Sequence, residues 1–379
     1  MINVVHVITG LNVGGAERTL LRLLANRTAS RFNPSVISLL DKGVIGPQIQ
    51  SLGVPVYPLG MKRGIPGPRV LIDLRRLLKK LDPDVIQGWM YHGNLAATVA
   101  ASSLGRRVPV LWNIRQSLYG LAKERWLTRQ VIYGSAWLSR SPKIILYNSK
   151  TSASQHEAMG FKPQKTRIIP NGFDCNEYYP DKRMREQVRK ELEIPLNTLL
   201  IGLIARYHPM KDHSNFLRAA AELMKAEEGM RIAFLLAGRG IDLPNGPLIE
   251  LIGRLGLGSK VYLLGERQDI SRLMMALDIA TVASAWGEGF PNVLGEAMAC
   301  SIPCVATDVG DSAYLIADTG KIVPPKNPQA LAAAWQALIG VGVKGRKGLG
   351  EKARRRIAEH FNLSEIVHQY EQLYLEVTP

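Results

Sequence analysis

Residues 286–299 read Trp-Gly-Glu-Gly-Phe-Pro-Asn-Val-Leu-Gly-Glu-Ala-Met-Ala and lie between two apolar runs, 279–283 and 303–306. Each run has the length and composition of a buried strand. Asn292 is a favourable N-cap, so the sequence predicts a helix that starts there, with its first backbone N–H groups facing the preceding loop. A helix start of this kind is a binding site for an anion such as phosphate.

Two carboxylates, Glu288 and Glu296, stand eight positions apart around this helix start. Most glutamates in α/β proteins are solvated surface residues, but the loop between these two contains Gly-Phe-Pro-Asn, which is costly to keep at a surface without a function. A carboxylate beside a bound phosphate would repel it. We therefore expect both carboxylates to accept hydrogen bonds from hydroxyl groups on either side of the phosphate. A ligand with hydroxyls, phosphate and again hydroxyls is a nucleotide sugar.

The spacing Glu288-x7-Glu296 resembles the signature of the retaining glycosyltransferases of family 4. Four neighbouring residues also match that family's pattern, namely Gly289, Phe290, Ala297 and Met298. The resemblance implies an α/β chain with GT-B architecture. In that architecture two Rossmann-like domains face each other across a cleft, and the C-terminal helix crosses back to the N-terminal domain. The resemblance covers nearly the whole chain, with its motifs concentrated in residues 199–310.

Apolar runs of strand length alternate with helical segments along the chain, which is typical of parallel sheets covered by helices on both faces. In the first half these runs lie at 3–9, 34–40, 54–58, 84–87, 110–113 and 143–147, and in the second half at 199–204, 232–237, 261–264, 279–283, 303–306 and 321–323. We predict an N-terminal, acceptor-binding domain of residues 1–177, to which the resemblance adds 363–379. A C-terminal, donor-binding domain covers residues 196–362.

The chain has 379 residues, of which 46% are hydrophobic, and this is enough for two cores. It contains no run of about 18 apolar residues, so the sequence predicts no membrane-spanning helix. Its first residues have the pattern of a strand rather than of a signal peptide. We therefore expect a cytoplasmic protein.

The net charge of +16 is concentrated in the first half of the chain. Residues 1–177 contain 24 Lys and Arg against 9 Asp and Glu, whereas residues 178–379 contain 24 against 23. Such an excess attracts an anionic partner, and nucleic acid and an anionic membrane surface are the two candidates.

A helix predicted within residues 118–140 carries aromatic residues on one stripe. The stripe comprises Tyr119, Trp126, Tyr133 and Trp137, flanked by Lys123, Arg129 and Arg140, while Leu127, Val131 and Leu138 are expected on the opposite side, against the sheet. An aromatic stripe at helical spacing is most often buried, and Gly134-Ser135 could break the helix. With the basic charge and the basic helix predicted at 69–81, the stripe favours peripheral docking on the inner face of a membrane.

Arg206 and Lys211 follow the predicted strand 199–204, with Lys211 near a helix start. Two cations at this place neutralise a diphosphate and stabilise the charge that it gains as it leaves. They are similar to an Arg and Lys pair in the resembled family, which implies that they replace a metal ion. Asp82-Pro83-Asp84 precedes a strand, so we interpret it as a helix end followed by a strand start rather than as a metal site.

The resemblance implies a donor site without a cofactor. The donor-binding residues would be Gly15, Arg206, Lys211, Gly238, Arg267, Glu288, Gly289, Phe290, Pro291, Asn292, Val293, Leu294 and Glu296. Gly15 belongs to a glycine-rich first loop in which a side chain would block the approach of the backbone to the phosphate. The donor is a UDP-sugar or a GDP-sugar, because recognition of the base through backbone atoms leaves the choice open.

On the acceptor side the candidates are His92, Asn113 and Arg115. Many members of the resembled family have a histidine after the fifth strand, where this chain has Asn113 and Arg115. His92 follows the fourth strand and has an equally plausible local role at a helix start.

These features together predict a retaining, metal-independent hexosyltransferase-type enzyme, with Glu288, Arg206 and Lys211 as catalytic residues. It would move a sugar from a nucleoside-diphosphate sugar to a hydroxyl of a glycan, in particular a lipid-linked glycan of cell-surface polysaccharide synthesis. A nucleotide-sugar epimerase of the same architecture and a basic nucleic-acid-binding protein are the alternatives. The epimerase needs acid and base residues, of which no clear set emerges, and the nucleic-acid-binding protein does not explain the two glutamates. We expect no nucleic-acid partner.

Overall fold

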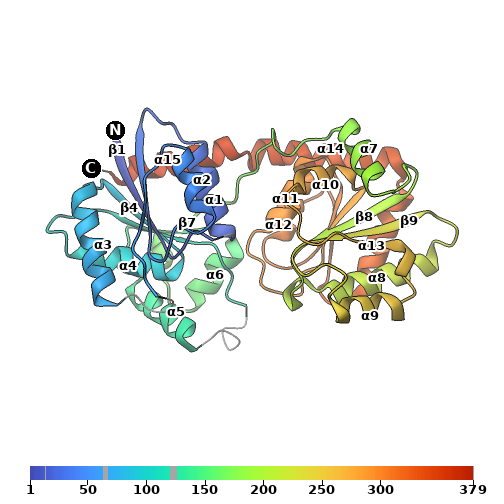
Figure 1. The fold of residues 1–379 in the computed structure, drawn as a ribbon, viewed down its shortest axis with the longest axis horizontal. Coiled ribbons are helices and arrows are strands. Elements are labelled where there is room, and N and C mark those ends of the chain that lie inside the picture. Colours follow the sequence, from blue (N-terminus) through green and yellow to red (C-terminus); the bar gives the residue numbers. More distant parts are fainter. Residues whose placement is uncertain (13, 63–66, 120–125, 379) are drawn as a thin grey trace. The chain divides into compact units, whose positions relative to one another are not determined.

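The computed structural model describes residues 1–12, 14–62, 67–119 and 126–378. The chain divides into two compact units (Figure 1). The first unit contains Met1–Gly172 and Leu363–Pro379, and the second contains Phe173–Asn362.

The first unit is built on a parallel sheet of seven strands in the order β3-β2-β1-β4-β5-β6-β7. The strands are β1 Ile2–Ile8, β2 Phe32–Ser38, β3 Val56–Pro58, β4 Val85–Trp89, β5 Val110–Ile114, β6 Ile144–Tyr147 and β7 Thr166–Ile168. Its helices are α1 Gly15–Ala25, α2 Ile45–Ser51, α3 Pro68–Leu81, α4 Met90–Ser102, α5 Trp126–Leu138, α6 Lys150–Ala158 and α15 Leu363–Val377.

Alternate residues of the strands in this unit enter two cores, one on each face of the sheet. Val4 and Ile8 of β1 pack with α1, α2 and α15, whereas Val5 and Val7 pack with α3, α4, α5 and α6. The period of two follows from the pleat of a strand. The C-terminal helix α15 thus completes the first unit, as the resemblance predicted.

The second unit has a parallel sheet of six strands in the order β10-β9-β8-β11-β12-β13. The strands are β8 Leu199–Ile204, β9 Ile232–Ala237, β10 Val261–Leu263, β11 Ile279–Val282, β12 Cys304–Thr307 and β13 Lys321–Val323. Its helices are α7 Lys182–Glu191, α8 His213–Ala226, α9 Gly246–Arg254, α10 Ile270–Ala276, α11 Asn292–Ala299, α12 Ser312–Ile316, α13 Pro328–Gly340 and α14 Gly342–His360. Helices α8, α9 and α13 cover one face of the sheet, and α7, α10, α11, α12 and α14 cover the other.

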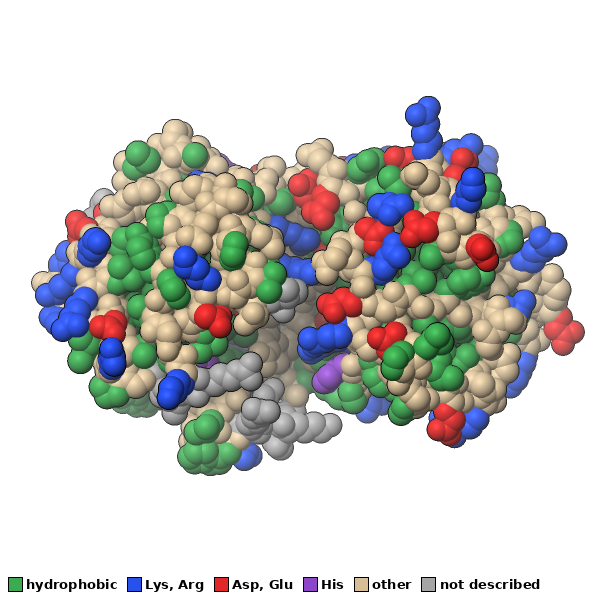
Figure 2. Space-filling view, viewed as in Figure 1, with side chains coloured by type: hydrophobic (Ala, Val, Ile, Leu, Met, Phe, Trp, Pro, Cys, Tyr) green, Lys and Arg blue, Asp and Glu red, His purple; other side chains and the backbone are tan. Residues whose placement is uncertain are grey.

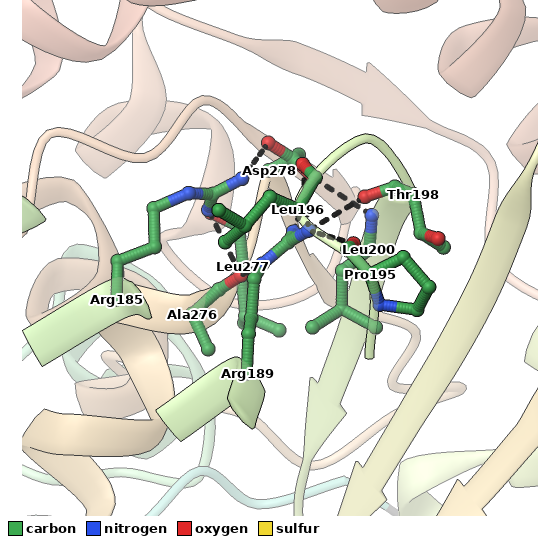
Figure 3. Close-up of polar contacts among 9 residues, drawn as sticks. All are labelled: Arg185, Arg189, Pro195, Leu196, Thr198, Leu200, Ala276, Leu277 and Asp278. Atoms are coloured by element: carbon green, nitrogen blue, oxygen red, sulfur yellow. Dashed lines mark hydrogen bonds and ion pairs between the residues drawn. The ribbon is translucent and has the colours of Figure 1, made fainter. Parts of the chain in front are cut away.

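The boundary between the units lies at residues 172 and 173, before the predicted position 177, and the segment 178–195 belongs to the second unit rather than to a linker. The reason is an ion-pair network that anchors α7 (Figure 3). The fully buried Arg189 donates from Nη2 to Oδ2 of Asp278 over 2.7 Å, and Arg185 donates to Oδ1 over 2.7 Å. Arg189 also donates to the carbonyl oxygens of Ala276 and Thr198 at 2.9 and 2.7 Å, which joins α7 to the amino end of β11.

Helix α5 carries large exposed aromatic side chains. Trp126, Tyr133 and Trp137 are 62%, 52% and 76% exposed, and the helix continues through Gly134-Ser135 without a break. Val131 is buried in the core, as predicted, but the prediction that Leu127 packs on the sheet is wrong, because this side chain is 49% exposed. Since Leu127 is the second residue of the helix, it lies before the first turn that reaches the core. Lys123 lies outside the described residues.

Candidate functional site

The strand order of the second unit reverses between β8 and β11, so the loops after these two strands flank the switch point of the sheet, where α/β proteins bind ligands. Lys211 ends a short 3-10 turn, Pro209–Lys211, that follows β8. The turn is held by Nδ1 of His208, which accepts a hydrogen bond from the Met210 N–H at 3.2 Å. Asp212 then starts α8 by accepting from the Asn215 N–H at 3.1 Å.

Glu288, in the loop after β11, forms an ion pair with Lys211. The Lys211 Nζ donates to Oε1 of Glu288, and Oγ of Ser284 donates to the same oxygen at 2.5 Å. The Glu288 and Lys211 side chains are 10% and 21% exposed. Burying a carboxylate is costly unless it is paired, so the two donors hold Glu288 in one place at the switch point.

Backbone contacts brace this loop against its neighbours. The Ala285 N–H donates to the Met210 carbonyl at 2.8 Å, which ties the loop of Glu288 to the loop of Lys211. Gly287 has φ +81°, and a Cβ there would lie 2.5 Å from Sδ of Met210. A Cβ on Gly310 would lie 2.5 Å from the carbonyl oxygen of Glu288. These close approaches explain the glycines, because no larger residue fits.

Helix α11 begins one residue earlier than predicted. Pro291 is its N-cap, with extended ψ of 109°, and Asn292 is the first helical residue. The prediction that Asn292 caps the helix is wrong, because the chain leaves the extended conformation at Pro291. A proline offers no side-chain acceptor, and α11 has no side-chain cap at this position. Glu296 lies one turn inside the helix and is buried.

The apolar residues of the predicted donor loop are structural supports. Phe290 is buried and stacks on Phe173 with ring centroids 6.3 Å apart. Leu294 is fully buried in the same core, and Val293 packs against it. Gly295 leaves the space that the Phe173 ring fills. Consequently Gly289 through Leu294 contribute their backbone to the surface of the site, while the large side chains fix its shape.

Arg206 lies two residues after the end of β8 and is exposed. Burial, and then the positive charges of Arg206 and Lys211, lower the pKa of His208. These three side chains therefore share one electropositive neighbourhood. A bound anion would relieve the repulsion between the two cations.

Two further predicted donor residues follow β9 and β10. Gly238 has φ +145°, and a Cβ there would clash with the carbonyl of Ala205. Its N–H donates to the Gly265 carbonyl at 2.7 Å, which links the two loops. Arg267 is held by Asp269 through two bonds of 2.8 Å and by Glu191 at 3.0 Å. These hydrogen bonds raise the pKa of Arg267. The Arg267 side chain is thus already bonded to two carboxylates, those of Asp269 and Glu191. Its backbone is therefore better suited than its side chain to contact a ligand.

In the first unit, Gly15 is the first residue of α1. His92 lies in the first turn of α4, and partial burial lowers its pKa. Asn113 and Arg115 lie at the end of β5 and are joined through Tyr370 of α15, whose hydroxyl accepts from Asn113 Nδ2 at 3.0 Å and from Arg115 Nη1 at 2.9 Å.

The sequence did not predict Ser284, Tyr370 or Asn171 as parts of these clusters. Ser284 stands four residues before Glu288 at the end of a buried strand, and this position was a usable signal. Tyr370 and Asn171 reach Arg115 from 255 and 56 residues away, and one sequence carries no signal for such pairings. In the described residues no group of three or more His, Cys, Asp or Glu is placed to hold a metal ion. Asp82 ends α3 and Asp84 precedes β4, as predicted.

Comparison with known families assigns both halves of the chain. Residues 13–177 match the model described as "Glycosyltransferase Family 4", and residues 198–340 match "Glycosyl transferases group 1". The two models together cover most of the chain, and the chain belongs to the family 4 glycosyltransferases, the family that it was expected to resemble.

Individual relatives agree with this assignment. The chain is 23% identical over 315 residues to the UDP-Gal:alpha-D-GlcNAc-diphosphoundecaprenol alpha-1,3-galactosyltransferase of Escherichia coli, covering 81% of this chain and 79% of the relative. It is 25% identical over 287 residues to the N-acetyl-alpha-D-glucosaminyl L-malate synthase of Bacillus anthracis, covering 75% and 72%. Among solved structures, HepE of Anabaena in complex with UDP has a TM-score of 0.86 at 22% identity, covering 99% of this chain and all of that one.

The fold prediction of two Rossmann-like domains of GT-B type is confirmed. The comparisons support glycosyl transfer and support neither the epimerase nor the nucleic-acid-binding alternative. No helix in the described part of the chain is both long and apolar enough to cross a membrane.

Proposed function

We propose that the protein is a retaining, metal-independent glycosyltransferase that moves a sugar from a nucleoside-diphosphate sugar to a hydroxyl of a lipid-linked glycan. The observation that carries this proposal is the Lys211–Glu288 ion pair at the switch point, beside the start of α11. It places a cation for phosphate and an acceptor for sugar hydroxyls within contact of each other.

In this proposal the donor diphosphate binds where Lys211, Arg206 and the first turn of α11 converge. Glu288 accepts hydrogen bonds from hydroxyls of the transferred sugar, and Glu296 accepts from the ribose. The remaining donor contacts within the second unit come from the backbone of residues 289–294, 238 and 267. The base is uracil or guanine. The complex with UDP is a property of the structural relative, and it favours UDP for this chain.

The chemical step breaks the bond between the anomeric carbon and the phosphate oxygen, and the bonding electrons pass to the phosphate. The acceptor hydroxyl forms the new bond on the same face, and its proton passes to the leaving phosphate oxygen. Lys211 and Arg206 stabilise the growing charge on that phosphate, which is the task of a divalent metal in other transferases. No cofactor takes part.

The proposed acceptor is suggested by the Escherichia coli relative, whose name specifies a diphosphoundecaprenol-linked sugar. A lipid-linked acceptor requires the enzyme to reach a membrane surface. We place this contact on the α5 surface, defined as Tyr119, Trp126, Tyr133 and Trp137 of the first unit. In Figure 2 a group of hydrophobic side chains stands out at the position of α5, with basic atoms beside it.

The positive charge of the first unit also favours membrane contact through the α5 surface. The first unit contains 24 Lys and Arg against 10 Asp and Glu. Five of these cations, Arg69, Arg75, Arg76, Lys79 and Lys80, are exposed on α3, which covers the same face of the sheet as α5. Each contributes about 1 kcal/mol near an anionic membrane at moderate salt. The protein would then act as a peripheral cytoplasmic enzyme in polysaccharide synthesis.

The proposed function is tested by incubating the purified full chain with a panel of UDP- and GDP-sugars in the presence of chelator and following release of the nucleoside diphosphate. The anomeric configuration of the released sugar is read by NMR at early times. Hydrolysis of one donor class with the original configuration retained is expected. Inversion, or hydrolysis of no donor, contradicts the proposal.

A further inference from the structure

The second candidate cluster of the chain lies at the carboxyl edge of the first sheet, around Arg115 after β5. The guanidinium of Arg115 is half-buried and has three hydrogen-bond partners: Asn113 Oδ1 at 3.4 Å, the Tyr370 hydroxyl at 2.9 Å, and Asn171 Oδ1. All three are neutral side chains. Among the described residues Arg115 forms no ion pair with a carboxylate.

Arg115 can be compared with other arginines of this chain by the groups that compensate the guanidinium charge. Arg189 is compensated by Asp278, and Arg267 by Asp269 and Glu191 (Figure 3 for Arg189). Several partly buried arginines without a carboxylate partner donate instead to carbonyl oxygens at the C-terminal ends of helices, which carry partial negative charge. This is the case for Arg27, Arg346, Arg354 and Arg356. Arg115 has neither kind of compensation.

The guanidinium of Arg115 also has N–H groups that donate to no described residue. Of its five N–H groups, Nη1 makes two bonds and Nη2 makes one, so within the described residues the Nε–H and one Nη2–H have no partner. Two adjacent donors of a guanidinium bind two oxygens of a phosphate or carboxylate side by side. The Tyr370 hydroxyl accepts from both Asn113 and Arg115, so its own proton remains available to donate.

We propose that Arg115, positioned by Asn113, Asn171 and Tyr370, binds an anionic group of the glycosyl acceptor, and that the acceptor therefore carries a phosphate or a carboxylate. The inference rests on the proposed function, because it assigns the first unit to the acceptor. It deepens that function by assigning the recognition of the acceptor's anionic group to a named residue. The excess of cations in the first unit attracts the same anion over a longer range.

The test uses the full chain, saturated with the nucleoside diphosphate that it binds, and inorganic pyrophosphate as the probe in calorimetry. Wild-type protein should bind pyrophosphate at a second site. Arg115→Gln should weaken this binding by about tenfold to a hundredfold, the range expected for a charge-assisted hydrogen bond. Arg107→Gln, which removes an exposed arginine of the same unit, should leave it unchanged. Tyr370→Phe removes the positioning oxygen but keeps the charge, and should weaken binding by less.

Two readouts separate the possible failures. Transfer by Arg115→Gln should show a raised KM for the acceptor, and the KM of this variant in donor hydrolysis without acceptor is the second readout. A folded Arg115→Gln protein that binds pyrophosphate like wild type overturns the inference, and so does a raised KM for donor hydrolysis, which would assign the anion to the donor. If Arg115→Gln unfolds, the comparison is made with Arg115→Lys, where loss of the bidentate contact still predicts weaker pyrophosphate binding. Absence of donor hydrolysis in the wild type instead counts against the proposed function itself.

Discussion

Lys211 and Glu288 form a nearly buried ion pair that joins the loop after β8 to the loop after β11, at the point where the strand order of the second sheet reverses. The two residues are 77 positions apart in the chain. Parallel strands bring their carboxyl ends to one edge of a sheet, so the meeting of these loops follows from the topology. The side chains that meet are a carboxylate, which accepts hydrogen bonds, and an ammonium group, which donates them.

If Arg206 and Lys211 take the place of a metal, activity should persist in excess chelator. Changing either residue to Ala should lower kcat by roughly a hundredfold, because both stabilise charge that develops only as the phosphate leaves. Lys225→Ala, which removes an exposed lysine of α8, is the matched control and should be neutral. Loss of activity with EDTA that is restored by Mg²⁺ or Mn²⁺ would contradict this role.

Ser284→Ala removes one of the two donors to Glu288 Oε1 without touching the ion pair. A hydrogen bond to a charged group is worth about 1.5–3 kcal/mol, so we expect a loss of at least tenfold in kcat/KM for the donor. An unchanged kcat/KM in steady-state kinetics would show that the Ser284 hydrogen bond is not needed to position the carboxylate.

The ion-pair network of α7 should govern stability rather than chemistry, since Asp278 lies at the amino end of β11 and Glu288 follows its carboxyl end. Arg189→Met leaves a partly buried Asp278 with one partner fewer and should lower the free energy of unfolding by about 3 kcal/mol. Arg185→Met, which removes the more exposed partner, should cost about 1 kcal/mol. Urea denaturation measures both. If both variants lost the same free energy of unfolding, the burial of Arg189 would not explain its contribution to stability.

The α5 surface should bind anionic liposomes and bind zwitterionic ones only weakly. The protein should be released from anionic liposomes at high salt, because salt screens exposed charges. The double change Trp126→Ala and Trp137→Ala should reduce cosedimentation several-fold, since each exposed indole anchors at the lipid interface. Leu243→Ala, at an equally exposed apolar residue of the second unit, is the control. Negligible binding of wild-type protein to both liposome types at low salt would favour a soluble acceptor.

The sequence predicted the fold and the loop of Glu288 because both depend on local patterns. Continuous apolar runs identify parallel strands, and the stretch from Trp286 to Ala299 contains a strand end, a loop and a helix start within a few residues. The N-cap was placed one residue late because Asn292 is the better capping residue by type, whereas backbone geometry selects Pro291.

Other parts of the structure depend on packing that one sequence does not reveal. The segment 178–195 lies between the two predicted domains, and the sequence does not reveal that Arg185 and Arg189 pair with Asp278 and so tie this segment to the second unit. The sequence likewise does not reveal that Asp269 and Glu191 hold the Arg267 side chain, and the place of Arg267 among the predicted donor residues rests on the resemblance. Arg115 was identified, but its partner Tyr370 comes from the last helix of the chain.

The central claim is that Glu288 binds the transferred sugar, and its most direct test is the rate of donor turnover in Glu288→Gln. The change keeps the shape of the side chain and weakens its charge-assisted bonds to hydroxyls, so kcat should fall by a factor on the order of 10² or more, with circular dichroism and thermal midpoint unchanged. Glu351→Gln, at an exposed glutamate of α14, should behave like wild type. A folded Glu288→Gln protein that turns over its donor at near the wild-type rate would contradict the account.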